Sequence, residues 1–262
     1  MRADTAPGAV SERVLFDGDY ARAVCFNPGA DRLFVTFDHW RKQHVDFAPV
    51  QASGRVMAAG FAQLCILSSR NDWYLSPDLA GLRHSLLAAS GAYAEVRGIG
   101  FSMGAYGALL LSKALRLQKL VLVSPQYSIF PGRVPFDPRY HAEAAELAPD
   151  MDDLARDVQP GLRGVILYDP SARYRDRAHA LAIEAVSPGL RRVAMPFTGH
   201  PAMAAIREAR LYGKVMAAAL GGDLAGSDLA GDFRRIHRAA RLVSPHYQTR
   251  LRKYLLQRSL RG

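Results

Sequence analysis

The sequence predicts an α/β fold in which helices cover a largely parallel sheet. Short apolar runs alternate with helical patterns through most of the 262 residues, as in repeated strand–helix units. Three of the later apolar runs are nearly continuous, which is typical of strands buried on both faces. Nearly half of the residues are hydrophobic, and no apolar run reaches the roughly 18 residues that span a bilayer. The composition therefore provides for a large buried core.

Eight apolar runs are candidate strands, and four longer stretches are candidate helices. The strands are expected at 13–16, 22–26, 33–37, 63–67, 96–101, 119–123, 164–168 and 191–195. The helices are expected at 78–89, 103–115, 176–186 and 201–219. The order of the strands within the sheet is left open.

The stretch 125–160 interrupts the alternation. It holds six prolines and four aromatic residues, followed by an acidic patch. An insertion after a strand, on the side where active-site loops lie, is typical of a lid or a substrate wall. An ordinary surface excursion is the alternative.

The C-terminal region differs from the rest in charge. The chain carries a net charge of +10, and residues 232–262 contribute +8 of it, with nine Lys or Arg against one acid. The Gly- and Asp-rich run 221–231 indicates a linker, and apolar residues then recur at helical spacing. We therefore expect a domain at 1–220, with its lid insertion at 125–160, and a basic helical extension at 232–262.

A basic amphipathic extension is typical of a segment that binds an anionic partner or an anionic membrane surface. Packing on the protein's own body, with the basic face in solvent, is the alternative. No recognised nucleic-acid motif accompanies the extension, so we do not expect a nucleic-acid partner. Oligomeric state is left open. Residues 1–12 lack the apolar core of a signal peptide, and Cys25 and Cys65 lie in apolar runs, which predicts a cytoplasmic protein with buried free thiols.

The string Gly100-Phe101-Ser102-Met103-Gly104 has the pattern G-x-S-x-G between a predicted strand and a predicted helix. A serine on such a sharp turn presents its hydroxyl at the N-terminus of the helix, where the helix dipole and free backbone N–H groups favour negative charge. The glycines are needed because the serine backbone is strained and the chain passes close to its neighbours. Ser102 is therefore the predicted nucleophile.

A serine hydroxyl needs a base, and His200 is the best placed of eight histidines. It follows the predicted strand 191–195 through a short turn and immediately precedes a predicted helix. His84 and His179 lie within helical patterns and are expected at the surface. The sequence therefore predicts His200 as the base.

The order Ser, Asp, His calls for an acid between the nucleophile and the base. Asp169 directly follows the predicted strand 164–168, at the edge of the sheet where the site lies. Asp176 is the alternative, at the start of a predicted helix, where an aspartate commonly serves as the N-cap. We favour Asp169, which would hold the imidazole in the useful tautomer and stabilise its charged form.

The oxyanion hole needs two backbone donors. One is expected to be the N–H of Met103, and the other to come from the loop after strand 33–37, at His39 or Trp40. The His39 side chain could also face the site. The acids and histidines of 38–46 lack the spacing of metal ligands, so we expect neither a metal nor a cofactor.

These residues resemble those of the α/β-hydrolase superfamily, over residues 12–220. More narrowly, four segments are similar to a bacterial group of predicted hydrolases found near surface-polysaccharide genes. They are Phe34-Val35-Thr36-Phe37, Asn71-Asp72-Trp73-Tyr74, Ser102-Met103-Gly104-Ala105-Tyr106-Gly107-Ala108 and Ser124-Pro125-Gln126-Tyr127. That group usually has Gly where this chain has Ala105. The resemblance implies the α/β-hydrolase fold, with helices on both faces of the sheet.

The leading function is a serine hydrolase that cleaves an ester or thioester through an acyl-enzyme, on a small-molecule or glycan-linked acyl substrate. An acyltransferase that uses the same catalytic triad of serine, histidine and aspartate is the nearest alternative, because the acyl group can pass to a sugar or alcohol hydroxyl instead of water. A third possibility is a non-catalytic hydrolase-fold scaffold whose basic tail binds a partner.

Overall fold

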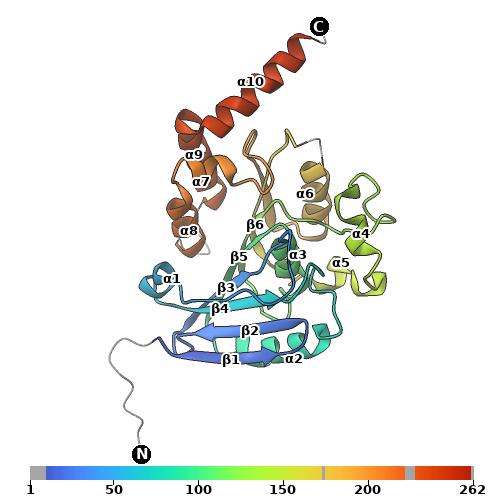
Figure 1. Cartoon of the computed structure of the whole chain (residues 1–262). Helices are drawn as coiled ribbons and strands as arrows, with labels where there is room; N and C mark the ends of the chain where they lie inside the picture. Colours follow the sequence, from blue (N-terminus) through green and yellow to red (C-terminus); the bar gives the residue numbers. More distant parts are fainter. Residues whose placement is uncertain (1–9, 173–174, 222–227, 261–262) are drawn as a thin grey trace, which may run out of the picture.

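The computed structural model describes residues 10–172, 175–221 and 228–260, and an eight-stranded sheet forms its centre (Figure 1). The strands lie in the order β1-β2-β4-β3-β5-β6-β7-β8. β2 runs antiparallel to β1 and to β4, and the remaining neighbours are parallel. Their bounds are β1 Glu12–Asp17, β2 Ala21–Phe26, β3 Arg32–Phe37, β4 Phe61–Ser68, β5 Glu95–Phe101, β6 Lys119–Val123, β7 Arg163–Tyr168 and β8 Leu190–Ala194. The predicted, mostly parallel sheet is confirmed.

Helices cover both faces of this sheet. The α-helices of the described residues are α1 Gly54–Ala58, α2 Leu79–Ser90, α3 Met103–Leu110, α4 His141–Ala144, α5 Leu154–Asp157, α6 Arg175–Val186, α7 Ala204–Glu208, α8 Tyr212–Leu220, α9 Leu229–Val243 and α10 Pro245–Ser259. Two predicted helices are shorter than expected. The helix expected at 103–115 ends at Leu110, and the one expected at 201–219 is divided between α7 and α8, where Arg210 has a φ of 57° that a helix cannot accommodate.

Among the described residues, most of the core lies in two apolar clusters on opposite faces of the sheet, and a third, small cluster is formed by Val24, Phe26 and Cys65. Successive residues of β6 alternate between the two large clusters, because side chains along a strand point to opposite faces. Leu120 and Leu122 belong to the cluster that includes residues of α2, α3 and α6. Val121 and Val123 belong to the cluster that includes residues of α1, α7, α8 and α9. The sheet is thus covered on both sides.

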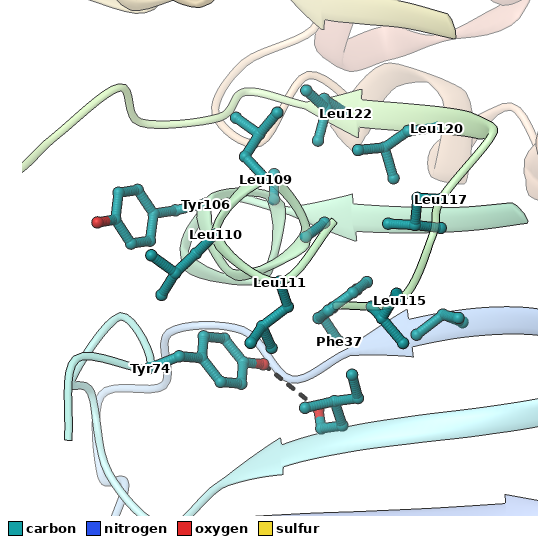
Figure 2. Close-up of a cluster of buried hydrophobic side chains, with 14 of the residues drawn as sticks. Phe37, Tyr74, Tyr106, Leu109, Leu110, Leu111, Leu115, Leu117, Leu120 and Leu122 are labelled. Atoms are coloured by element: carbon teal, nitrogen blue, oxygen red, sulfur yellow. Dashed lines mark hydrogen bonds between the residues drawn. The ribbon is translucent and has the colours of Figure 1, made fainter. Parts of the chain in front are cut away.

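Helix α3 lies deep in the first cluster, and all of its residues are buried. Figure 2 shows its leucines between the leucines of β6 and the ring of Tyr74. The Tyr74 hydroxyl donates to the backbone oxygen of Asp38 at 2.9 Å and to that of Ile66 at 3.3 Å. The helix that follows Ser102 is therefore fixed by packing on several sides.

The insertion 125–160 consists of short helical turns that pack on the same cluster as α3. Its buried Asp152 accepts hydrogen bonds from the hydroxyls of Tyr106, at 2.7 Å, and of Ser128. Burial raises the pKa of Asp152. Because Tyr106 belongs to α3, this carboxyl group anchors the insertion to the helix that starts at the turn around Ser102, which we call the elbow.

The predicted linker 221–231 differs from the observed structure. Residues 222–227 lie outside the described part of the chain, but α9 already begins at Leu229. The Asp228 side chain accepts from the backbone N–H of Gly231 at 3.0 Å, and this cap starts the helix earlier than the expected 232. Phe233 and Ala240 of α9 are fully buried in the second cluster, whereas α10 projects from the body of the molecule (Figure 1).

We predict that Gly100→Ala destabilises the protein. A Cβ at this position would lie 2.5 Å from the Gly104 oxygen and 2.6 Å from the Ala105 Cα, so β5 and α3 would have to separate. Urea denaturation should show a loss of about 2 kcal/mol in the free energy of unfolding. Gly132→Ala, where a Cβ meets nothing within 4 Å, is the matched control. Equal stability of the two variants would contradict the prediction.

Candidate active site

Ser102 lies between the end of β5 and the start of α3, in a backbone conformation that few residues adopt. Its φ is 49° and its ψ is −119°, so the turn is strained. Its backbone N–H donates to the Val123 oxygen at 2.9 Å, which ties the turn to the neighbouring strand. A Cβ at Gly104 would collide with the backbone oxygen of Asp38. The predicted elbow is thus a tight turn that needs glycine beside it.

His200 lies in the loop between β8 and α7, and its Nε2 is 3.3 Å from the Ser102 Oγ. The loop is longer than the sequence predicts, since α7 begins only at Ala204. The imidazole side chain is 22 % exposed, so the pair lies near the surface. The structure therefore places the predicted nucleophile and the predicted base within reach of each other.

The second imidazole nitrogen of His200 faces Asp176, not the favoured Asp169. Its Nδ1 lies 3.0 Å from the Asp176 Oδ2 and 3.2 Å from the Oδ1. A carboxylate accepts and does not donate, so the proton belongs on Nδ1 and the Nε2 lone pair faces the Ser102 hydroxyl. Asp176 is in the first turn of α6, one residue inside the helix. Its side chain is thus free to point at the imidazole.

Asp169 has a different task in the same region. Its carboxylate is fully buried and accepts from the backbone N–H groups of Ser171 at 2.8 Å, Phe197 at 3.0 Å and Gly199 at 2.8 Å. Phe197 and Gly199 belong to the loop that carries His200. The sequence favours Asp169 as the partner of His200, but the structure shows Asp176 in that position. The carboxylate of Asp169 is instead engaged by these backbone N–H groups.

Solved structures with the same arrangement of elements belong to acyl-transferring and hydrolytic enzymes. A capsule O-acetyltransferase of Neisseria meningitidis serogroup A, in complex with CoA, is 14% identical, with a TM-score of 0.53, over 77% of this chain and 93% of that one. An α/β-hydrolase enzyme from a Medee basin deep-sea metagenome library is 13% identical, with a TM-score of 0.51, over 88% and 98%. This chain has the α/β-hydrolase fold. No protein-family model and no curated protein matches the sequence.

The charge on Asp176 is maintained by its neighbours in this hydrolase fold. Burial by itself would raise its pKa, but the hydrogen bond from His200 and the charges of His200 and Arg139 outweigh burial, so the pKa is lowered. The Arg139 Nη2 lies 3.4 Å from the Asp176 Oδ1. Arg139 comes from the insertion 125–160, so this segment contributes directly to the electrostatics of the site.

A second buried pair ties the insertion to α6. His179, expected at the surface, is fully buried, and its Nε2 is 2.9 Å from the Asp137 Oδ2. The His179 Nδ1 accepts from the Tyr127 N–H at 3.0 Å, so the proton lies on Nε2. Asp137 also accepts from Arg139 at 2.5 Å. The helix that holds Asp176 is therefore connected to the insertion through two residues that sequence reasoning did not identify.

The loop that was expected to supply an oxyanion donor lies beside the first turn of α3, since Asp38 contacts Gly104. Met103 is the first residue of that helix, and the N–H groups of the first turn have no acceptor within the helix. The His39 N–H donates to the Asp38 carboxylate at 2.9 Å, which engages one of the two proposed second donors. The indole of Trp40 donates to Glu143 at 3.0 Å. The donor roles of Met103, His39 and Trp40 stay predictions.

Sequence reasoning missed a buried amide beside the nucleophile. The Gln126 Nε2 lies 3.3 Å from the Ser102 Oγ, and its Oε1 accepts from the Trp73 indole at 3.2 Å. The Tyr140 ring packs on Trp73, with 4.7 Å between centroids. Burial raises the pKa of Tyr140, and the charge of Arg139 and a hydrogen bond with the Ser102 hydroxyl lower it by less. The available signals were the segments around Trp73 and Gln126, each directly after a predicted strand or its turn.

In residues 10–172, 175–221 and 228–260, no group of three or more His, Cys, Asp or Glu side chains is arranged to hold a metal ion. Across the same ranges, every helix is too short or too polar to cross a membrane. Cys25 and Cys65 are both free and buried, as the sequence predicts.

The C-terminal helices pack against the loop that carries His200. The Phe197 ring lies 5.5 Å from the Tyr247 ring and 5.4 Å from the Tyr254 ring, centroid to centroid. The Arg250 Nη2 is 3.7 Å from the Asp169 Oδ2. The far part of α10 and its end expose both basic and apolar side chains, among them Arg252, Lys253, Leu255, Leu256, Arg258 and Leu260. An anionic partner or membrane surface for this helix stays a prediction.

We predict that Asp169→Asn lowers the free energy of unfolding by about 2 kcal/mol, because the new Nδ2 cannot accept the Gly199 N–H and the buried donor loses its partner. Urea denaturation at neutral pH measures this loss. Asp169→Asn should also lower the protection of the 195–200 backbone from hydrogen exchange. Unchanged stability and unchanged protection would contradict the structural task assigned to Asp169.

We predict that Asp137 contributes to stability only while it is ionised. Burial would raise its pKa, but the hydrogen bonds from His179 and Arg139 lower the pKa far below its usual value of 3.8. The unfolded chain therefore binds this proton first as the pH falls, so the contribution is present above about pH 4 and is lost progressively below it. In Asp137→Asn, the free energy of unfolding should fall less steeply as the pH is lowered below about 4, as measured by urea denaturation at several pH values. An unchanged pH dependence would contradict this assignment.

Proposed function

We propose that the protein is a serine hydrolase that cleaves an ester or thioester through an acyl-enzyme on Ser102. The observation that carries the proposal is the continuous line of contacts at the elbow, from the Ser102 Oγ to the His200 Nε2 at 3.3 Å and from the His200 Nδ1 to Asp176 at 3.0 Å. Nucleophile, base and acid within hydrogen-bond reach are the arrangement that activates a serine hydroxyl.

In the proposed reaction, the Ser102 oxygen attacks the acyl carbon while His200 takes the hydroxyl proton. The tetrahedral intermediate collapses to the acyl-enzyme, and His200 gives the proton to the departing alcohol or thiol. Asp176 stabilises the imidazolium and fixes its orientation. Water, deprotonated by His200, then attacks the acyl-enzyme and releases the acid and free Ser102. The Met103 N–H is the proposed donor to the oxyanion.

Acyl transfer to a hydroxyl acceptor is the second candidate, and the likeness to a capsule O-acetyltransferase in complex with CoA favours it. The chemistry up to the acyl-enzyme is identical, and only the nucleophile of the second half differs. Single-turnover partitioning of a preformed acyl-enzyme between water and a panel of sugar acceptors distinguishes the two. Faster loss of the acyl group in the presence of one acceptor would identify transfer.

We predict that a fluorophosphonate probe labels the native protein and leaves Ser102→Ala unlabelled, because only an activated serine reacts. Ser112→Ala, which removes a hydroxyl that donates to the Leu109 oxygen and accepts from the Gln159 N–H, is the matched control and should label fully. Label that persists in Ser102→Ala would overturn the assignment of the nucleophile. Native protein that takes no label would favour a non-catalytic scaffold.

We predict that Asp176→Asn lowers kcat on an activated short-chain ester by about 10⁴-fold, since an amide at this position favours the wrong imidazole tautomer. Asp169→Asn should retain far more activity per folded molecule, because its contacts are with the loop backbone. Steady-state kinetics on both variants, corrected for the folded fraction, measures the difference. Greater loss in Asp169→Asn would show that the acid is assigned to the wrong residue.

A further inference from the structure

Gln126 is the only side-chain amide that the described residues bring to the Ser102 oxygen. It follows β6 in the segment Ser124-Pro125-Gln126-Tyr127, and its side chain is fully buried. A buried amide needs partners for one acceptor and two donors. The Gln126 amide contacts Trp73, Ser102 and Ser124, and together these three contacts determine which end of the amide faces the nucleophile.

The orientation of this amide follows from its partners. The indole N–H of Trp73 can only donate, so the group 3.2 Å from it must be the Gln126 oxygen. The backbone oxygen of Ser124 can only accept, and it lies 3.3 Å from the Gln126 nitrogen. The second N–H of that nitrogen then points at the Ser102 Oγ, also at 3.3 Å. The nucleophile thus accepts from Gln126 while it donates to His200.

Trp73 is itself held in place by a strained turn. Trp73 and Tyr74 have φ values of 50° and 62°, which cost free energy in residues with a Cβ. The Asp72 Oδ1 accepts the Tyr74 N–H at 2.8 Å and the Ser68 hydroxyl at 2.7 Å, and Tyr140 packs on the Trp73 ring. These contacts hold the strained turn, and the turn places the Trp73 indole where its N–H can donate to the Gln126 amide.

We propose that Gln126 is a further catalytic residue, whose N–H stabilises negative charge on the Ser102 oxygen when that oxygen is the leaving group. The inference rests on the proposed function. In the second half of the reaction, the bond between the acyl carbon and Oγ breaks with its electron pair on Oγ, and His200 returns the proton to it. A hydrogen bond to Oγ is strongest at that point, because a charged acceptor binds more tightly than an ester oxygen.

Trp73 is the positioning residue for this contact. Without the indole N–H, the amide has no donor to hold its oxygen away from Ser102, and it can rotate. Trp73 and Gln126 therefore act together on the Ser102 oxygen through one chain of hydrogen bonds, although they lie 53 residues apart in the sequence.

The test separates the two halves of the reaction with a p-nitrophenyl ester under stopped flow. Gln126→Met keeps the volume and removes the donor, and it should slow deacylation by about 10- to 100-fold while acylation changes much less. The acyl-enzyme then accumulates, so the burst grows and kcat and KM fall together. Gln63→Met is the matched control, because Gln63 is also buried but bonds to Ser53 and Cys65.

A double-mutant cycle tests the role of Trp73. Trp73→Phe should slow deacylation in the native background and have no further effect in the Gln126→Met background, since it acts through the amide. An additive loss in the double variant would show a merely structural role for Trp73. If Gln126→Met folds poorly, the single variant Trp73→Phe still tests the contact, because it removes the donor to the amide oxygen and leaves Gln126 in place.

Equal slowing of acylation and deacylation, or no slowing of either, in Gln126→Met overturns the inference. Fluorophosphonate labelling keeps this failure apart from that of the proposed function. Native protein and Gln126→Met should both be labelled at Ser102, so a labelled variant with unchanged deacylation refutes only the role of Gln126. Native protein without label refutes the serine mechanism and this inference with it.

Discussion

The backbone of Ser102 has a φ of 49°, and the surrounding structure must hold it there against a cost of roughly 1 to 3 kcal/mol. The strained turn persists because β5 is central in the sheet and α3 is buried along its whole length. Neither element can move to relax the turn without opening the core shown in Figure 2. The geometry at Ser102 thus depends on packing that lies outside the candidate site. Glycine at 100 lets β5 and α3 approach closely, and glycine at 104 lets α3 approach the Asp38 backbone at the end of β3.

The two carboxylates near His200 have different contacts because their surroundings differ. Asp169 is saturated by backbone N–H groups and holds the loop of His200. Asp176 faces the imidazole and the guanidinium of Arg139, and these neighbours outweigh the effect of burial, so its pKa is lowered. A carboxylate that already accepts three backbone donors has little capacity left to orient an imidazole. The loop and the base are therefore placed by separate acids, and each can be altered without directly removing the other's contacts.

The sequence predicts the sheet well because its strands are short, apolar and bounded by polar turns, and all eight runs correspond to strands within a few residues. The positions of Ser102 and His200 could be predicted for a similar reason, since Ser102 follows β5 directly and His200 lies in the loop that follows β8. The choice between Asp169 and Asp176 could not, because both lie at the same sheet edge and only the tertiary position of the loop amides separates them. Gln126 was missed because the orientation of its amide depends on Trp73, which is remote in sequence. Local patterns predict elements, whereas pairings across the fold decide chemistry.

The basic extension cannot be treated as an appendage to a finished domain. Its first helix, α9, buries Phe233 in the core of the sheet, and its second, α10, places Tyr247 and Tyr254 on Phe197 in the loop of His200. Deletion of 232–262 would expose that core and release the loop at once, so lost activity and lost partner binding would follow from one cause. The exposed far part of α10 is different, because its cationic side chains point into solvent. Charge reversal at Arg252 and Lys253 leaves Phe233, Tyr247 and Tyr254 unchanged, and it therefore separates binding of an anionic partner from support of the active site.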